Sequence, residues 1–193
     1  MTKWLSHRMV ERGIIKEEEQ ELYQFGIRNG MILLLNVVTA LVIGLLTEQL
    51  AVVAVFTLSF MVLRSYTGGY HSDSRVFCYL GSNLVLLVPV YTQAVFYKTS
   101  LAWLLAVLLV SAGIIFLLSP MYSKNRKLDK EEQKHFGRKA RLIAALELAV
   151  LGILWHAGQI PYAYAVYTGI CITALFMLVG KAQLWIQSHT ENG

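Results

Sequence analysis

The stretch LAWLLAVLLVSAGIIFLL, residues 101–118, decides the class of fold. It contains no charged residue, and Ser111 supplies its one hydroxyl. About 20 consecutive apolar residues in a helix are enough to cross the hydrocarbon core of a bilayer. The backbone polar groups of such a segment must be satisfied internally, and an isolated run in lipid achieves this only as a helix. The stretch therefore predicts a transmembrane helix.

The composition of the whole chain extends this prediction. The 193 residues are 56% hydrophobic and 15% charged, and the mean hydropathy is +0.53. Soluble domains carry roughly 25% charged residues, so this chain lacks the charge that a water-facing surface needs. We expect an all-α fold, a polytopic membrane protein.

Six apolar spans are predicted along the chain, of which the second and fifth are short for a full crossing. The first 28 residues form a charged, amphipathic segment, typical of an interfacial helix, which Gly13 interrupts. We expect three parts: this segment (1–28), a membrane domain (29–185) and a C-terminal tail (186–193). The expected spans are 29–46, 49–63, 79–97, 101–118, 142–157 and 161–180.

The distribution of Lys and Arg gives the orientation. Sixteen of the 17 basic residues fall in the segments 1–28, 64–78, 119–141 and 181–193, and Lys98 is the exception. Loops rich in Lys and Arg stay in the cytoplasm. The pattern predicts six helices in a cell membrane, with both termini cytoplasmic. The positive charge then serves topology and contact with anionic lipids, and no nucleic-acid partner is expected.

The segment 64–78, RSYTGGYHSDSRVFC, lies between the second and third spans. Its glycine pair, Gly68 and Gly69, predicts a helix break, and Cys78 is expected in the first turn of the next helix. A helix N-terminus favours the reactive thiolate form of cysteine, and His71 is a candidate general base or cationic partner. Seven residues of straight helix span about 10.5 Å. The chain between His71 and Cys78 must therefore curl for the two to cooperate.

The same residues have a plainer interpretation. A cysteine at a helix end often only packs, and a loop histidine is often solvated. Cys171, in the last span with no histidine near it in sequence, is expected to be structural. A metal site built on His71 and Cys78 would lack a third and a fourth ligand, so neither a metal nor a cofactor is predicted.

Arg64, Gly68, Gly69, His71 and Cys78 together form the pattern R-x-x-x-G-G-x-H-x6-C between membrane spans. This pattern resembles the AgrB family, the membrane endopeptidases of Gram-positive quorum sensing. The amphipathic N-terminus, the six spans and the Pro-led basic loop of residues 119–141 are also similar to that family's layout. The resemblance covers most of the chain.

The resemblance implies a substrate and a mechanism. Members of the AgrB family cut an AgrD-type propeptide on the C-terminal side of the signalling segment. The resemblance aligns their catalytic cysteine and histidine with Cys78 and His71. Cys78 would attack the scissile carbonyl and leave a thioester. A Cys or Ser of the bound peptide would then close a thiolactone or lactone ring. A homo-oligomer is an open alternative to a monomer.

Other residues carry weaker hypotheses. The guanidinium group of Arg64 would hold the loop or a substrate carboxylate through two parallel hydrogen bonds. Alternatively, Arg64 only marks the inside end of the second span. Asp73 would orient His71 or make a local turn, and Ser82 would line the site or pack between helices. Glu147, inside the fifth span, would face a cavity or pair with an inside Arg or Lys.

The loop 119–141 opens with Pro120 and continues as a short surface helix around Asp129 to Lys139. Its eight basic residues would attract an acidic substrate tail, or they only enforce topology. The alternatives to an enzyme of this family are a small transporter or an accessory membrane subunit, although no internal repeat is evident. Another type of intramembrane protease would need an H-E-x-x-H motif, a G-x-S-G motif or paired membrane aspartates, and the sequence has none of these.

Overall fold

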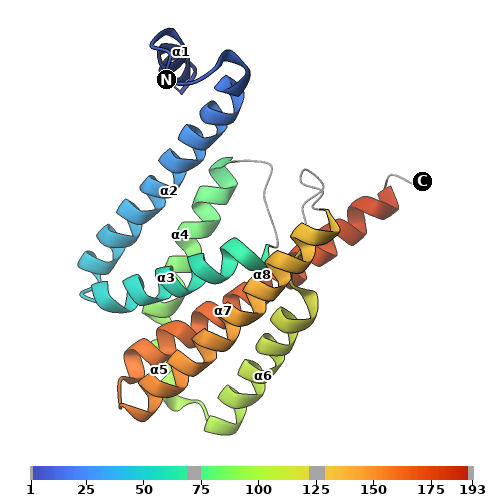
Figure 1. The fold of residues 1–193 in the computed structure, drawn as a ribbon. Coiled ribbons are helices and arrows are strands. Elements are labelled where there is room, and N and C mark those ends of the chain that lie inside the picture. Colours follow the sequence, from blue (N-terminus) through green and yellow to red (C-terminus); the bar gives the residue numbers. More distant parts are fainter. Residues whose placement is uncertain (1, 69–74, 122–128, 191–193) are drawn as a thin grey trace. The chain divides into compact units, whose positions relative to one another are not determined.

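The computed structural model describes residues 2–68, 75–121 and 129–190, and all regular structure in these ranges is helical (Figure 1). The chain divides into an N-terminal unit, Met1–Thr39, and a main unit, Ala40–Gly193. The elements are α1 (Thr2–Glu11), the 3-10 helix η1 (Glu17–Glu19), α2 (Gln20–Leu46), α3 (Leu50–Thr67), α4 (Arg75–Tyr91), α5 (Gln93–Lys98), α6 (Leu101–Leu118), α7 (Lys130–His156) and α8 (Ile160–Thr190).

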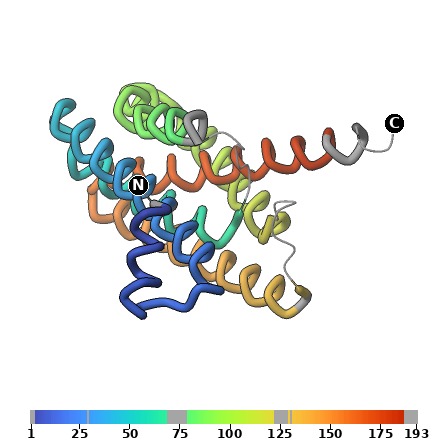
Figure 2. The backbone as a smooth tube through the Cα atoms, turned by 90° about the horizontal axis from the view of Figure 1, so that it is seen from above, coloured from blue at the N-terminus to red at the C-terminus, as the bar shows by residue number. Residues whose placement is uncertain are grey.

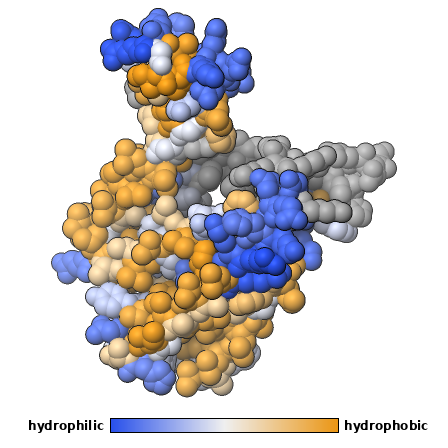
Figure 3. Space-filling view, in the orientation of Figure 1, coloured by the Kyte–Doolittle hydropathy of each residue, from blue (hydrophilic) through white to orange (hydrophobic). Residues whose placement is uncertain are grey.

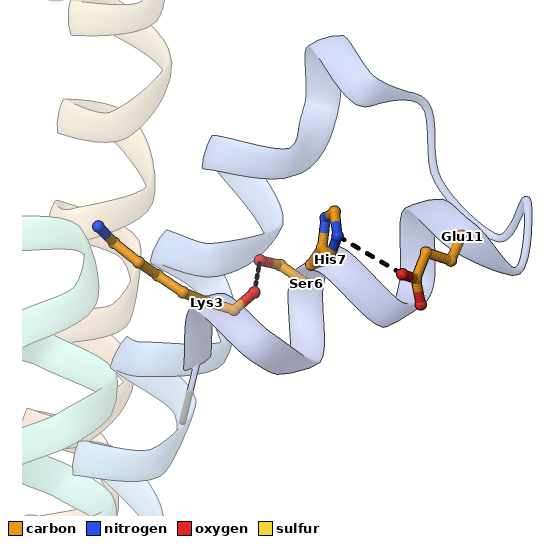
Figure 4. Close-up of polar contacts among 4 residues, drawn as sticks. All are labelled: Lys3, Ser6, His7 and Glu11. Carbon is orange, nitrogen blue, oxygen red and sulfur yellow. Dashed lines mark hydrogen bonds and ion pairs between the residues drawn. The ribbon is translucent and has the colours of Figure 1, made fainter.

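The N-terminal unit begins with the short helix α1. His7 and Glu11, one turn apart, approach to 3.5 Å, and the Ser6 hydroxyl donates to the Lys3 carbonyl (Figure 4). Trp4 is 61% exposed, with the Arg8 guanidinium 5.2 Å from its ring centre. The helix ends at Glu11, and Gly13 has a φ of 67°, which glycine adopts without strain. The predicted interruption at Gly13 is therefore confirmed.

Four helices of the described residues are long and apolar enough to cross a membrane: the segment Glu17–Leu46, α3, α6 and most of α8. The predicted third span is divided instead into α4 and α5, with Thr92 between them. Pro89, inside α4, has no amide hydrogen to donate to the carbonyl one turn earlier. This proline weakens the helix just before the break.

The predicted surface helix and the predicted fifth span form one continuous helix, α7. Asp129 caps its first turn by accepting hydrogen bonds from the amides of Glu131 and Glu132, at 2.8 and 3.0 Å. The stretch that follows lacks proline and is rich in Ala, Leu, Lys, Arg and Glu, which favour helix. Because charged residues remain in its span, α7 is not among the four strongly apolar helices.

Helix α8 is the centre of the main unit. It contacts every helix from α3 to α7, and it lies between α4 and α7 in the view of Figure 2. In the most apolar part of α8, 67% of the stretch is buried inside the chain, whereas the corresponding share for α6 is 11%. Apolar residues cover much of the visible face of the main unit (Figure 3), as expected for helices that face lipid.

The ends of the helices gather into two groups. The Tyr66 ring of α3 lies 6.3 Å from the Phe136 ring of α7, and Arg141 of α7 donates to the Phe116 carbonyl of α6 at 3.2 Å. The ends of α3 and α6 and the beginning of α7 therefore share one end of the unit, here called the Gly68 end. At the other end, the Phe96 end, the Phe96 ring of α5 contacts rings of α7 and α8: Trp155, Tyr164 and Tyr167.

Substitution of Phe56 tests this core. Phe56 is fully buried and its ring stacks on Phe60 at 5.8 Å, whereas Leu58 on the same helix is 67% exposed. Phe56→Ala should remove about 3–5 kcal/mol of stability, visible as a lower melting temperature in detergent micelles. Leu58→Ala, which faces lipid, should leave the melting temperature near that of the wild type. Equal melting temperatures for the two variants would contradict the described packing.

Candidate functional site

The α3 helix ends where the sequence predicts, at the first glycine of the pair. Thr67 is its last residue, and Gly68 follows with φ 71° and ψ −151°. A Cβ atom at Gly68 would overlap the carbonyl oxygen of Met121. The position therefore requires glycine both for its backbone conformation and for the close approach of another segment. The break that the catalytic hypothesis needs is present on the Gly68 side.

The neighbouring segment is the start of the basic loop. The Met121 amide donates a 2.8 Å hydrogen bond to the carbonyl of Thr67, which is the last residue of α3. Gly137 of α7 completes the junction, since a Cβ there would lie 3.0 Å from Cδ of Pro120. The segment 119–121 is thus held between the end of α3 and the first turns of α7. The two loops predicted at the cytoplasmic face are joined at their bases.

Arg64 belongs to the same junction. Its guanidinium donates to the Gly68 carbonyl, and it lies 5.4 Å from the ring centre of Phe176 on α8. Phe176 in turn packs edge-on against Phe60 at 5.9 Å. Arg64 therefore contacts the base of the 64–78 loop, and a role toward a substrate carboxylate stays a prediction.

The first turns of α7 carry a polar, basic surface. Among the side chains that the structure describes here, four exposed cations lie within 12 residues of the Asp129 cap, and hydrophilic residues cover this part of α7 in Figure 3. The Lys139 ammonium lies 5.8 Å from the ring centre of Tyr66, which ties the basic surface to the last turn of α3. The four cations, here called the α7 basic surface, are Lys134, Arg138, Lys139 and Arg141.

Helix α4 begins at Arg75, so Cys78 lies in its first turn, as predicted. Ser82, one turn further along, is half-buried. The far part of α4 is fixed by the buried residues Leu86 and Val90, which pack in a core with α3 and α8. Beyond it, the Thr92 hydroxyl hydrogen-bonds the Tyr164 hydroxyl of α8. Anchoring at this end determines where α4 presents its first turn.

Gly69, His71 and Asp73 lie outside the described residues, as does the side chain of Cys78. Cooperation between His71 and Cys78, and the orientation of His71 by Asp73, therefore stay predictions. In the ranges 2–68, 75–121 and 129–190, no group of three His, Cys, Asp or Glu side chains could hold a metal ion.

Glu147 has a partner that the sequence analysis missed. The hydroxyl of Ser59 on α3 donates to a carboxylate oxygen of Glu147 at 2.7 Å. This contact is a hydrogen bond from a neutral hydroxyl and not an ion pair. The sequence does carry a signal for this contact, because the two residues lie at similar depths in their spans. Ser59 lies five residues before the inside end at Arg64, and Glu147 lies six residues after Arg141. Cys171 of α8 is half-buried within the same helix bundle.

A cavity of about 270 Å³ opens at the Phe96 end, away from these residues. Its walls come from α5, α6, α7 and α8 and are almost entirely apolar, with Leu104, Leu108, Trp155 and Tyr167 among them. His156 also lies in its wall.

Comparison with known proteins relates most of the chain to one family. Residues 1–178 match the family described as AgrB, accessory gene regulator B. The accessory gene regulator protein B of Staphylococcus intermedius is 26% identical over 156 residues, covering 79% of this chain and 80% of that protein. A putative AgrB-like protein of Clostridium perfringens (strain SM101 / Type A) is 23% identical over 148 residues, covering 74% and 69%. No solved structure matches.

The match covers the helix break at Gly68, the start of α4 with Cys78 and the α7 basic surface, all within residues 1–178. The chain belongs to the accessory gene regulator B family.

Proposed function

We propose that this chain is a membrane-embedded cysteine endopeptidase in which Cys78 is the nucleophile and His71 its base. Membership of the accessory gene regulator B family implies a role in processing an AgrD-type propeptide. The observation that carries the proposal is the helix break at Gly68, followed by α4 with Cys78 in its first turn. This arrangement supplies a thiol at a helix N-terminus, where the thiolate is favoured.

The proposed reaction has two transfers. His71 takes the proton of the Cys78 thiol, and the sulfur attacks the scissile carbonyl of the propeptide. The C–N bond breaks, and His71 returns the proton to the amine of the departing acidic tail. The acyl group remains on Cys78 as a thioester. A thiol or hydroxyl within the bound peptide then attacks this thioester, closes the ring, and gives its proton back to the Cys78 sulfur.

We also propose that the chain crosses the membrane six times with both termini in the cytoplasm. Helices α3 and α6 both end at the Gly68 end, so the chain between them, with α4 and α5, runs back to the Phe96 end. Helix α7 begins at the Gly68 end and reaches the Phe96 end at Trp155. These return paths support two crossings beyond the four strongly apolar helices.

The α7 basic surface is the proposed attraction site for the acidic tail of the propeptide. It lies beside the base of the 64–78 loop, because Lys139 contacts Tyr66 and Met121 hydrogen-bonds Thr67. Exposed cations raise the local concentration of an anionic segment. A tail held there would bring the scissile bond toward the start of α4.

The direct test compares cleavage of the cognate propeptide by reconstituted wild type, Cys78→Ala and His71→Ala. Both variants should insert and fold but leave the peptide uncut, because one removes the attacking sulfur and the other its base. Cys171→Ala is the matched control and should cleave at the wild-type rate. Mass spectrometry of the peptide products measures the cleavage. Undiminished cleavage by Cys78→Ala would refute the mechanism.

Gly68→Ala should lower the cleavage rate roughly 100-fold, because displaced reacting groups cost rates of that order. The new Cβ overlaps the Met121 carbonyl, and the backbone has a positive φ. Gly113→Ala in α6 is the control, since no atom beyond its chain neighbours and the adjacent backbone of its own helix lies within 4 Å of the added Cβ. The measurement is the initial rate per folded, membrane-inserted protein. Equal rates for the two variants would show that the junction at Gly68 does not position the site.

Processing should weaken as the salt concentration rises, because salt screens attraction between exposed charges beyond about 10 Å at 0.1 M. Replacing Lys134 and Arg138 by Gln should reduce this salt dependence and raise KM for the propeptide. Lys98→Gln is the control, since Lys98 is exposed on α5 at the other end of the unit. A salt dependence unchanged by the double substitution would leave the basic residues with a topological role alone.

A further inference from the structure

A polar contact inside the membrane-spanning part of the main unit is not used by the proposed reaction. The Ser59 hydroxyl of α3 donates to the Glu147 carboxylate of α7 at 2.7 Å, and Ser59 is only 7% exposed. Acidic residues within a membrane span are costly, and they occur where a partner or a function retains them. The partner here comes from a helix 88 positions away in sequence.

Helix α8 is shaped to admit this contact. A Cβ atom at Gly169 would lie 2.5 Å from the Ser59 hydroxyl oxygen and 3.2 Å from its Cβ. Small residues at helix interfaces in membranes let the backbones approach closely. Glycine at this position therefore lets α8 press against α3 at the level where Ser59 reaches α7. Helices α3, α7 and α8 therefore pack together around the Ser59 hydroxyl.

The contact also fixes how far α3 slides along α7. The two helices run antiparallel, and a second contact that involves a charged group, Lys139 with the Tyr66 ring, lies nearer the end of α3. Ser59 precedes Tyr66 by seven residues, and Glu147 follows Lys139 by eight, so the two separations are similar, about 10.5 and about 12 Å at helical rise. Two contacts spaced alike on both helices define a single register.

That register determines where α3 ends. Gly68 lies nine residues beyond Ser59, directly after the last residue of α3, and it meets Met121 in a fit that leaves no room for a Cβ atom. A small sliding of α3 would separate Thr67 from Met121 and move the base of the 64–78 loop. Apolar packing alone tolerates such sliding better than a directed hydrogen bond does.

We propose that Glu147 is a positioning residue of propeptide processing, which acts through Ser59 to set the register of α3 on α7. The inference rests on the proposed function of Cys78. It requires a hydrogen-bond acceptor at position 147 rather than a negative charge. Leu63, Ala144, Val166 and Ile170 form a buried apolar core between α3, α7 and α8, so the fold survives loss of the contact.

The test measures kcat and KM for cleavage of the cognate propeptide in proteoliposomes, with melting temperature measured in parallel. Glu147→Leu and Ser59→Ala should each lower kcat about 10- to 100-fold, with KM and melting temperature close to those of the wild type. Glu147→Gln, which keeps an acceptor oxygen, should retain most of the activity. Thr57→Val is the matched control, because the Thr57 hydroxyl bonds the Val53 carbonyl within α3 and its loss should leave kcat unchanged.

Wild-type kcat in Glu147→Leu would overturn the inference. Equal loss of activity in Glu147→Gln and Glu147→Leu would overturn it too, since a positioning contact needs only an acceptor. Activity lost solely in proportion to folded protein would reduce the pair to a structural one. Cys78→Ala separates the two levels. If Cys78→Ala is inactive and Glu147→Leu is fully active, only the positioning role fails, whereas an active Cys78→Ala removes the proposed function and the inference with it.

Discussion

The hydrogen bond from the Met121 amide to the Thr67 carbonyl is the interaction on which the site depends. It forms because α3 stops at Thr67, which leaves that carbonyl without a partner within the helix. Glycine at position 68 supplies both the turn and the space for Met121. Helix ends in a membrane protein leave polar groups that must find partners. Here the partner comes from another loop, so one hydrogen bond joins the two segments that the proposed mechanism uses.

The packing of the main unit explains why this junction is stable. Helix α8 contacts all of α3 to α7, and glycine at position 169 brings it close to α3. The Phe60, Phe176 and Arg64 side chains continue the α3–α8 contact toward Gly68. The start of α4 is held from its far end, through Leu86, Val90 and the Thr92–Tyr164 hydrogen bond. The helices before and after the 64–78 loop are thus fixed to the same central helix.

Much of this could be predicted from the sequence where the cause is local. The apolar run 101–118 forms α6 with the predicted bounds, and the break at Gly68 and the start of α4 before Cys78 follow from glycine and helix patterns. The resemblance carried by Arg64, Gly68, Gly69, His71 and Cys78 led to the correct family. The predictions that failed concern contacts between residues distant in sequence, or segments in which two sequence signals compete. Continuity of α7 through Lys139 and Arg141 opposed the hydropathy pattern, and the Ser59–Glu147 contact joins distant positions.

The sparse burial of α6 has a consequence for how this chain can diverge. Only 11% of α6 is buried inside the chain, so most of its side chains are open to lipid, and any apolar residue suits such a neighbour. Mutation should therefore exchange Leu, Val, Ile and Phe at the exposed positions of α6 at little cost, whereas Ile115 is buried in the core. The junction at Gly68 allows no such exchange, because a single methyl group there meets a carbonyl oxygen. Sequence drift should therefore concentrate in the helix that first reveals the membrane fold, while the residues that reveal the family stay fixed.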